Sequence, residues 1–225
     1  ELRLTASFFE NRVNLTVGGF FLTQKSHYGG RISLRTARFV EDDDIPALTA
    51  AGFANAEWRI LPALNVVAGV RYTYQEKTFH YGRDQVPGAS MPLNPTLAML
   101  NSVSGKYDAD RLDYRVAVQY EWFRGLMSYA QFATGFKGGG VNPRPFFGDQ
   151  AISHKPETLN AFEVGAKSDL FDKRLRVNLA AFFNIYDDIV MTVTSCPAPA
   201  TTTPCGLPIN AGKANVFGGE LETVI

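Results

Sequence analysis

The sequence PETLNAFEVGAKSDLFDKRLRVNLAAFFNIYDDI, residues 156–189, decides the fold class. Apolar residues occupy every other position from Leu175 to Ile185, with polar residues such as Arg176 between them. A period of two places these two sets on opposite faces of a β-strand. Residues 162–170 alternate in the same way. The stretch therefore predicts two long antiparallel strands joined by a tight turn at residues 171–173.

The same alternation recurs along most of the chain and predicts an all-β antiparallel meander, curved but not closed. The nine expected strands lie near residues 1–9, 12–24, 51–60, 63–79, 110–122, 126–137, 156–170, 174–189 and 212–224. Tight turns alternate with long connections, which are expected at residues 26–49, 80–109, 138–155 and 194–211.

These lengths favour an outer-membrane barrel over a soluble sheet. Compact soluble domains rarely carry several structureless loops longer than about 15 residues. Outer-membrane barrels have short turns at one end and long loops at the other. The expected strands, of about 10 to 17 residues, also exceed the usual length in globular sheets and suffice to cross a bilayer. Trp58 and Trp122 lie close to short turns, as in an interfacial aromatic girdle.

The composition excludes several other classes of protein. Lys plus Arg total 22, as do Asp plus Glu, so no net charge marks a binder of nucleic acid. No apolar run approaches the roughly 18 residues of a membrane helix. His27, His80 and His154 all fall in the expected long connections, and none belongs to a recognisable nucleophile motif. No enzyme, cofactor or metal site is predicted.

Several segments resemble, in the right order, the C-terminal barrel of TonB-dependent outer-membrane receptors. MSYAQFATGFKGGGVNP (Met127 to Pro143) resembles a strand that runs into a Gly-rich outer loop of that family. Residues 156–189 resemble its PET…YDDI hairpin, and NAGKANVFGGELE (Asn210 to Glu222) is similar to a later strand. Leu64 to Tyr74 resembles its strand with the pattern L…AG.RY. Residues 1–50 match only in pattern.

The resemblance implies a 22-stranded barrel, an N-terminal plug domain and a segment that engages the TonB complex. Residues 1–225 are then expected to be a partial β-barrel domain, without the plug and the terminal strands. The implied function is active import through the outer membrane of a Gram-negative bacterium, with a ferric siderophore or another iron chelate as the expected cargo. Uptake of a glycan or cobalamin is an alternative, as are a passive porin or adhesin and an outer-membrane enzyme.

Candidate site residues follow from the expected topology. Aromatic and cationic residues in the outer loops suit an anionic chelate, through ring contacts and charge-assisted hydrogen bonds. The outer-loop candidates are Tyr28, Arg31, Arg35, Tyr81, Arg83, Tyr107, Arg144 and Phe146. Charged residues on the inward face are expected to contact the plug, the substrate or one another. These lumen-facing candidates are Arg71, Arg115, Lys137, Glu163, Lys167, Arg176, Glu220 and Glu222.

Two further features lie in the expected loops. Cys196 and Cys205 flank a segment rich in Pro and Thr and have no zinc-site spacing, so a local disulfide in an oxidising compartment is expected. The run Glu41 to Asp44 is EDDD, which lacks the spaced glycine and distal glutamate of a calcium loop. These four carboxylates are expected to be solvated.

Overall fold

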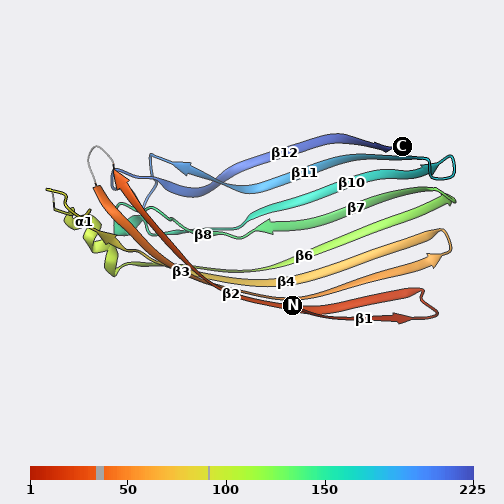
Figure 1. Ribbon diagram of the computed structural model, residues 1–225, viewed down its shortest axis with the longest axis horizontal. Coiled ribbons are helices and arrows are strands. Elements are labelled where there is room, and N and C mark those ends of the chain that lie inside the picture. The colour runs from red at the N-terminus through yellow and green to blue at the C-terminus, as the bar shows by residue number, and fades with distance from the viewer. Residues whose placement is uncertain (34–37, 91) are drawn as a thin grey trace.

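The computed structural model describes residues 1–33, 38–90 and 92–225, and nine long strands of these residues form one curved antiparallel sheet (Figure 1). Their bounds are β1 Leu2–Phe8, β2 Val13–Ser33, β3 Arg38–Leu61, β4 Leu64–His80, β6 Ser104–Phe123, β7 Leu126–Lys137, β10 Glu157–Leu170, β11 Leu175–Val193 and β12 Leu207–Val224. Each strand pairs with the next one in this series, as the alternating pattern predicts.

The remaining elements are short. They are β5 Arg83–Asp84, which pairs with β3, the strand pair β8 Gly140–Val141 and β9 Ser153–His154, the helix α1 Pro95–Ala98, and the 3₁₀ helices η1 Met99–Ser102 and η2 Gly148–Gln150. Within the described part of the chain, no helix is long and apolar enough to cross a membrane.

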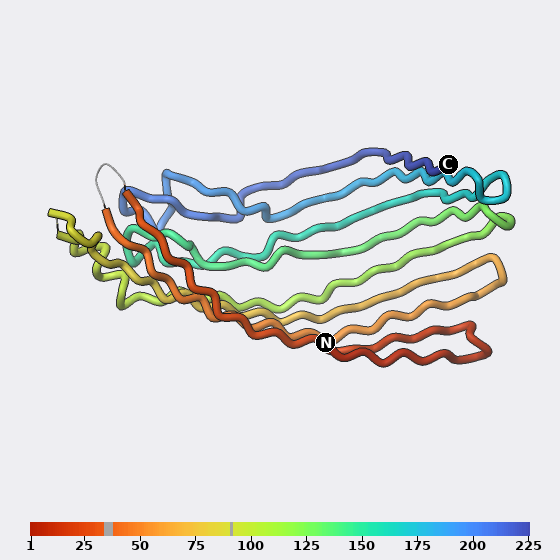
Figure 2. The backbone as a smooth tube through the Cα atoms, viewed as in Figure 1, coloured from red at the N-terminus to blue at the C-terminus, as the bar shows by residue number. Residues whose placement is uncertain are grey.

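The two ends of the sheet differ, as Figure 2 shows: tight turns lie at one end and long connections at the other. The turn after β10 uses Phe171, Asp172 and Lys173, all with positive φ. The turn between β6 and β7 contains Gly125 at φ 95°, where a Cβ would lie 2.7 Å from the carbonyl oxygen of Asp169. These local backbone conformations return each strand beside its predecessor. We call the end with the long connections the outer end.

The strand register gives the sheet one apolar and one polar face. Val116, Phe132, Phe162, Phe183 and Phe217 form a continuous row of directly paired residues across five strands. This row lies on the apolar face, where Phe162 is 44% exposed and Phe217 is 76% exposed. A sheet that exposes its large apolar side chains and turns its polar side chains the other way has the pattern of a barrel wall in lipid.

The prediction of a long connection at residues 26–49 is wrong for residues 26–33 and 38–49, while residues 34–37 lie outside the described part of the chain. β2 and β3 continue through it as a paired ladder that ends with Ser33 opposite Arg38. The alternation is weak there because a hairpin that extends beyond the membrane has water on both faces, so nothing selects apolar residues at every second position. For the same reason β6 and β12 begin earlier than predicted, at Ser104 and Leu207.

A small apolar core lies at the outer end. The connection of residues 81–103, which we call the capping loop, packs Leu97 and Leu100 against Phe39 of β3 and Tyr107 of β6. Gly82 permits the approach, since a Cβ there would lie 2.0 Å from the carbonyl oxygen of Asp42. The capping loop and the connections between β7 and β10 and between β11 and β12 thus meet at this end of the sheet (Figure 1).

Candidate functional site

A pocket of about 620 Å³ lies among these connections at the outer end. It is lined by Tyr28, Asp43, Ile45, Phe79, Asn142, Pro143, Arg144, Phe146, Thr192, Gly206 and Pro208. We call it the outer pocket. The lining residues from β2, β3 and β4 belong to the polar face by strand register, so the pocket opens on the side opposite the lipid-facing row. Its wall is mainly apolar and aromatic, and it includes one guanidinium.

That guanidinium belongs to Arg144, which contacts Tyr28 across 116 residues of sequence. Arg144 Nη2 donates a hydrogen bond to the Tyr28 hydroxyl oxygen at 2.6 Å, and the guanidinium carbon lies 5.8 Å from the centre of the Tyr28 ring. The hydrogen bond to Tyr28 raises the pKa of Arg144, which stays cationic at any physiological pH. Phe146 lies on the same wall. The structure thus brings together three of the predicted outer-loop residues.

Three other predicted outer-loop contacts, Tyr81, Arg83 and Tyr107, are buried and do not line the outer pocket, so their contact with a ligand stays a prediction. The Tyr81 hydroxyl donates to the carbonyl oxygen of Asn142 at 2.7 Å, and the Tyr107 hydroxyl accepts from the backbone N–H of Gly139 at 2.9 Å. Both tyrosines hold the connection between β7 and β10 in place. The hydroxyls of both tyrosines are thus used within the protein.

The run EDDD was predicted to be solvated, and this is wrong for Glu41 and Asp43, which are each 1% exposed. Arg83 Nη1 lies 2.5 Å from Asp43 Oδ1, and Arg83 Nη2 lies 3.3 Å from Glu41 Oε1. Burial raises the pKa of Glu41, although Arg83 acts in the opposite direction. The three side chains form a buried ionic group that fastens the capping loop to β3.

The other two carboxylates of this run, Asp42 and Asp44, lie on the opposite face of β3 and are exposed. Both contact His27 of β2: Asp42 Oδ1 lies 2.8 Å from Nε2, and Asp44 Oδ1 lies 3.2 Å from Nδ1. Hydrogen bonding to Asp44 and the charge of Asp42 raise the pKa of His27. In the described residues no group of three or more His, Cys, Asp or Glu side chains is arranged to hold a metal ion.

Two predicted outer-loop candidates do not join the outer pocket. Arg31 is exposed on β2, at a register position on the face opposite Tyr28. Arg35 lies outside the described residues. All eight lumen-facing candidates do share the polar face, because the registers from β4 to β12 connect them in steps of two. These are Arg71, Arg115, Lys137, Glu163, Lys167, Arg176, Glu220 and Glu222.

Sequence reasoning missed the residues that hold the Arg144 segment. Asn142 and Gln150 are 1% and 0% exposed and share several hydrogen bonds with neighbouring backbone. A polar residue in a Gly/Pro-rich segment carries no sequence signal of burial. Ile45 and Phe79 were also missed as lining residues, although both keep the period of two that marks the polar face. That period already marks Phe79 within its predicted strand, and it would have identified Ile45 had residues 26–49 been read as strand.

The structure joins Cys196 and Cys205 in a disulfide, with Cα atoms 6.3 Å apart. It closes the connection of residues 194–206, which we call the stapled loop. Cys205 is buried with Ala200 and Leu207 in a small cluster that also contacts Ile152. The stapled loop therefore packs against the segment that carries Arg144, and its last residue, Gly206, lines the outer pocket.

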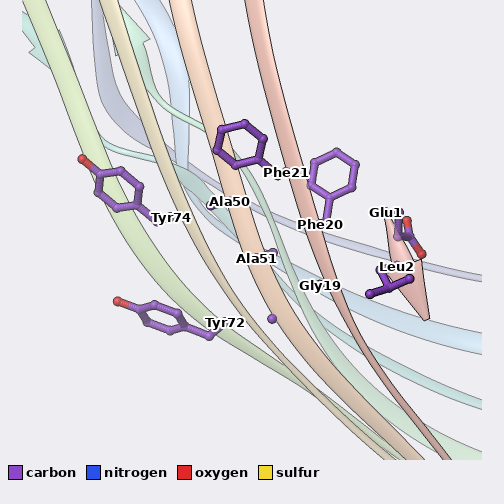
Figure 3. Close-up of a pocket in the computed structure, with 10 residues that line it drawn as sticks. Glu1, Leu2, Gly19, Phe20, Phe21, Ala50, Ala51, Tyr72 and Tyr74 are labelled. Carbon is purple, nitrogen blue, oxygen red and sulfur yellow. The ribbon is translucent and has the colours of Figure 1, made fainter. Parts of the chain in front are cut away.

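A second hollow, of about 600 Å³, lies near the start of β1 (Figure 3). Small residues on neighbouring strands, including Gly19 and Gly52, form its floor, and Tyr72 and Phe21 lie at its edge. Most of its lining belongs to the apolar face, so it is a depression in the lipid-facing surface. Its polar groups are the Glu1 carboxylate and the hydroxyls of Tyr72 and Tyr74, of which the Tyr74 hydroxyl already donates to Glu76 at 3.0 Å, and we assign it no binding role.

Comparison with known proteins supports the outer-membrane interpretation of the fold. Residues 2–224 match the family model of the TonB dependent receptor-like β-barrel. The chain is 26% identical over 176 residues to the pesticin receptor of Yersinia enterocolitica, and equally to that of Yersinia pestis. The match covers 78% of this chain and 23% of each receptor. The chain thus spans about a quarter of the length of these curated relatives.

Solved structures share the fold at low sequence identity. The ferric yersiniabactin uptake receptor FyuA from Yersinia pestis superposes with a TM-score of 0.76 at 19% identity, over 98% of this chain and 31% of that one. The ferric-catecholate import receptor Fiu from E. coli K12 superposes with a TM-score of 0.68 at 16% identity, over 98% of this chain and 34% of that one. The chain belongs to the TonB-dependent receptors, a family of transport receptors, and its sheet is part of a β-barrel that spans the outer membrane.

Proposed function

We propose that the receptor containing this chain imports a ferric siderophore or another iron chelate, and that the TonB complex supplies the energy. The observation that carries the proposal is the outer pocket, with Arg144, Tyr28 and Phe146 on one wall. The pocket lies at the outer end of the sheet and on its polar face. In this proposal the plug and the TonB-contacting segment belong to the rest of the receptor.

The chemistry of the wall suits an anionic chelate with aromatic or apolar groups. A guanidinium has five N–H donors in a planar fork. One N–H of Arg144 donates to Tyr28. The other N–H groups suit a negatively charged oxygen of a ligand, such as that of a carboxylate, phenolate or hydroxamate. The rings of Phe146 and Phe79 and the apolar Ile45 supply contact area for the ligand's body. Most binding sites for small molecules combine an apolar wall with a few polar groups in this way.

Two structurally similar receptors carry names that agree with this cargo. FyuA is named for ferric yersiniabactin and Fiu for ferric catecholates, and both share the fold. A glycan or cobalamin is the alternative cargo, since aromatic faces also stack on sugars. The described lining contains one cation, Arg144, and one carboxylate, Asp43, which is already paired with Arg83. Arg144 therefore favours an anionic ligand over a neutral glycan, because a charged hydrogen bond contributes more than one between neutral groups.

The proposal is tested by deleting the full-length gene and measuring uptake of radiolabelled iron with single siderophores, during iron starvation. The deletion should abolish uptake with at least one siderophore, and the wild-type gene should restore it. Growth on cobalamin or glycans as limiting nutrients is measured in parallel. Unchanged iron uptake with every siderophore, together with a defect on a glycan or vitamin, would overturn the iron assignment.

Substitution of Arg144 connects the function to the outer pocket. Arg144→Gln removes the charge but retains hydrogen-bonding capacity, and we expect it to weaken binding of the ferric chelate about tenfold or more. Arg59→Gln is the matched control, because Arg59 is exposed at the opposite end of β3. Equal affinities of the Arg144→Gln and wild-type receptors for every imported chelate would remove the outer pocket from the proposal.

A further inference from the structure

We propose that Gln150 positions residues 142–146, most of which line the outer pocket and which we call the binding wall, by fastening them to the stapled loop. The Cys196–Cys205 disulfide then influences the affinity of the pocket for its ligand. The inference rests on the proposed function only for the identity of that ligand. The positioning itself is a property of this chain and can be measured without any ligand.

Gln150 is completely buried, and both ends of its side-chain amide are used. On one side, Oε1 accepts the backbone N–H of Phe146 at 2.8 Å. On the other, Nε2 donates to the carbonyl oxygens of Thr202 and Pro204 at 2.8 and 2.9 Å. One amide therefore bridges the wall that carries Phe146 and the loop that the disulfide closes.

The backbone of Gln150 extends this bridge toward Arg144. Its carbonyl oxygen accepts from Asn142 Nδ2 at 3.0 Å, and Asn142 Oδ1 accepts the backbone N–H of Arg144 at 3.1 Å. The carbonyl oxygen of Asn142 in turn accepts the Tyr81 hydroxyl. These hydrogen bonds form a network around Gln150, and removal of its side chain would leave three partly buried backbone groups without that partner, which is costly.

The stapled loop is a suitable anchor because it is closed and packed. The disulfide removes freedom from the loop before it docks. Thr202 Oγ1 also donates to Asp149 Oδ2 at 2.7 Å, beside Gln150. Two more hydrogen bonds join the side chain of Asn210 to the backbone of Lys155: the Lys155 N–H donates to Oδ1 at 2.7 Å, and Nδ2 donates to the Lys155 carbonyl oxygen at 2.9 Å. They hold only the far end of the connection between β7 and β10, and they do not place residues 142–146.

The first measurement is hydrogen exchange in the full-length, ligand-free receptor in detergent micelles. Gln150→Met keeps the size of the side chain and removes all three of its hydrogen bonds. We expect exchange to accelerate about tenfold or more in peptides covering residues 142–150 and 194–206, and to stay unchanged in the barrel strands. Gln24→Met is the matched control, because Gln24 is exposed on β2 and, among the described residues, its side chain bonds only Ser26.

Gln150→Glu separates positioning from simple loss of structure. The carboxylate still accepts from Phe146, but its second oxygen then faces the two carbonyl oxygens of the stapled loop. Exchange in residues 194–206, relative to the wild type, should rise at pH 8. It should fall back toward the wild-type value at pH 5.5, where a protonated carboxyl donates again. A structural defect without this geometry would show no such return.

The second measurement is a double-mutant cycle on affinity for the imported ferric chelate. Gln150→Met and the pair Cys196→Ser/Cys205→Ser should each weaken binding, by about tenfold and about fivefold respectively. The combined variant should weaken binding by less than the product of the two separate effects, because the disulfide acts in part through Gln150. Fully additive effects, or wild-type exchange and affinity in Gln150→Met, would overturn the inference. If exchange changes as expected but no iron chelate binds the wild type, the proposed function fails and the positioning stands.

Discussion

Replacement of Arg83 by methionine removes the cation from the buried ionic group at the outer end of the sheet. Arg83 lies against Glu41 and Asp43, and its guanidinium carbon is 5.5 Å from the ring centres of both Phe39 and Tyr81. Methionine fills a similar volume and suits the two rings, so the change tests the charge and not the packing.

The free energy that Arg83→Met costs depends on how Glu41 and Asp43 are stabilised once their cation is removed. Removing one partner of a buried ion pair usually costs about 3–5 kcal/mol. Here we take the lower part of that range, because burial already raises the pKa of Glu41 and the substitution removes the Arg83 charge that lowers it, which makes protonation of Glu41 less costly. Asp43 also keeps the hydrogen bond that its Oδ1 accepts from the Gly82 N–H at 3.0 Å. We expect Arg83→Met to destabilise the docked capping loop by about 3 kcal/mol, which raises its equilibrium constant for opening roughly a hundredfold.

Hydrogen exchange in the full-length receptor measures that equilibrium. Protection in peptides covering residues 81–103 should fall by about a hundredfold in Arg83→Met, while protection in the barrel strands stays at the wild-type level. Arg59→Met is the control with the same loss of charge at an exposed site. Unchanged protection of the capping loop in Arg83→Met would refute the reasoning, because it would mean that the ionic group contributes nothing to docking.

Three further predictions concern the same end of the sheet and its lipid-facing side. Gly82→Ala should reduce protection of the capping loop in the same exchange experiment, since the new Cβ would lie 2.0 Å from the carbonyl oxygen of Asp42. Burial raises the pKa of Glu41 above its ordinary value of 4.5, so the docked loop binds a proton more readily than the open one. Its stability should therefore fall as the pH rises from about 4.5 through the raised pKa, and Glu41→Gln should abolish this dependence in exchange measured against pH. Val118→Arg should destabilise the barrel in lipid vesicles by about 2–4 kcal/mol in denaturant titrations, whereas Gln119→Arg, on the polar face, should be tolerated; equal effects would contradict the assignment of the faces.

Much of the sheet was predictable because its determinants are local. A period of two, as in Leu175 to Ile185, specifies both strand and face, and tight turns such as Phe171 to Lys173 specify which strands pair. The eight charged residues expected in the lumen do share one face for this reason. The prediction was wrong where the hairpin of β2 and β3 leaves the bilayer, since alternation disappears once water lies on both faces.

The sequence by itself determined the antiparallel meander, the assignment of each strand residue to a face and the family, because alternation, turns and short motifs are properties of neighbouring residues. Only the tertiary structure decided which loop residues form a site. Tyr28 meets Arg144 across the sheet, whereas Arg83, an equally polar candidate, is buried with two carboxylates. Loop residues owe their exposure or burial to contacts between connections far apart in the chain, and a charge becomes buried when such a contact supplies its partner. No local pattern records that partner.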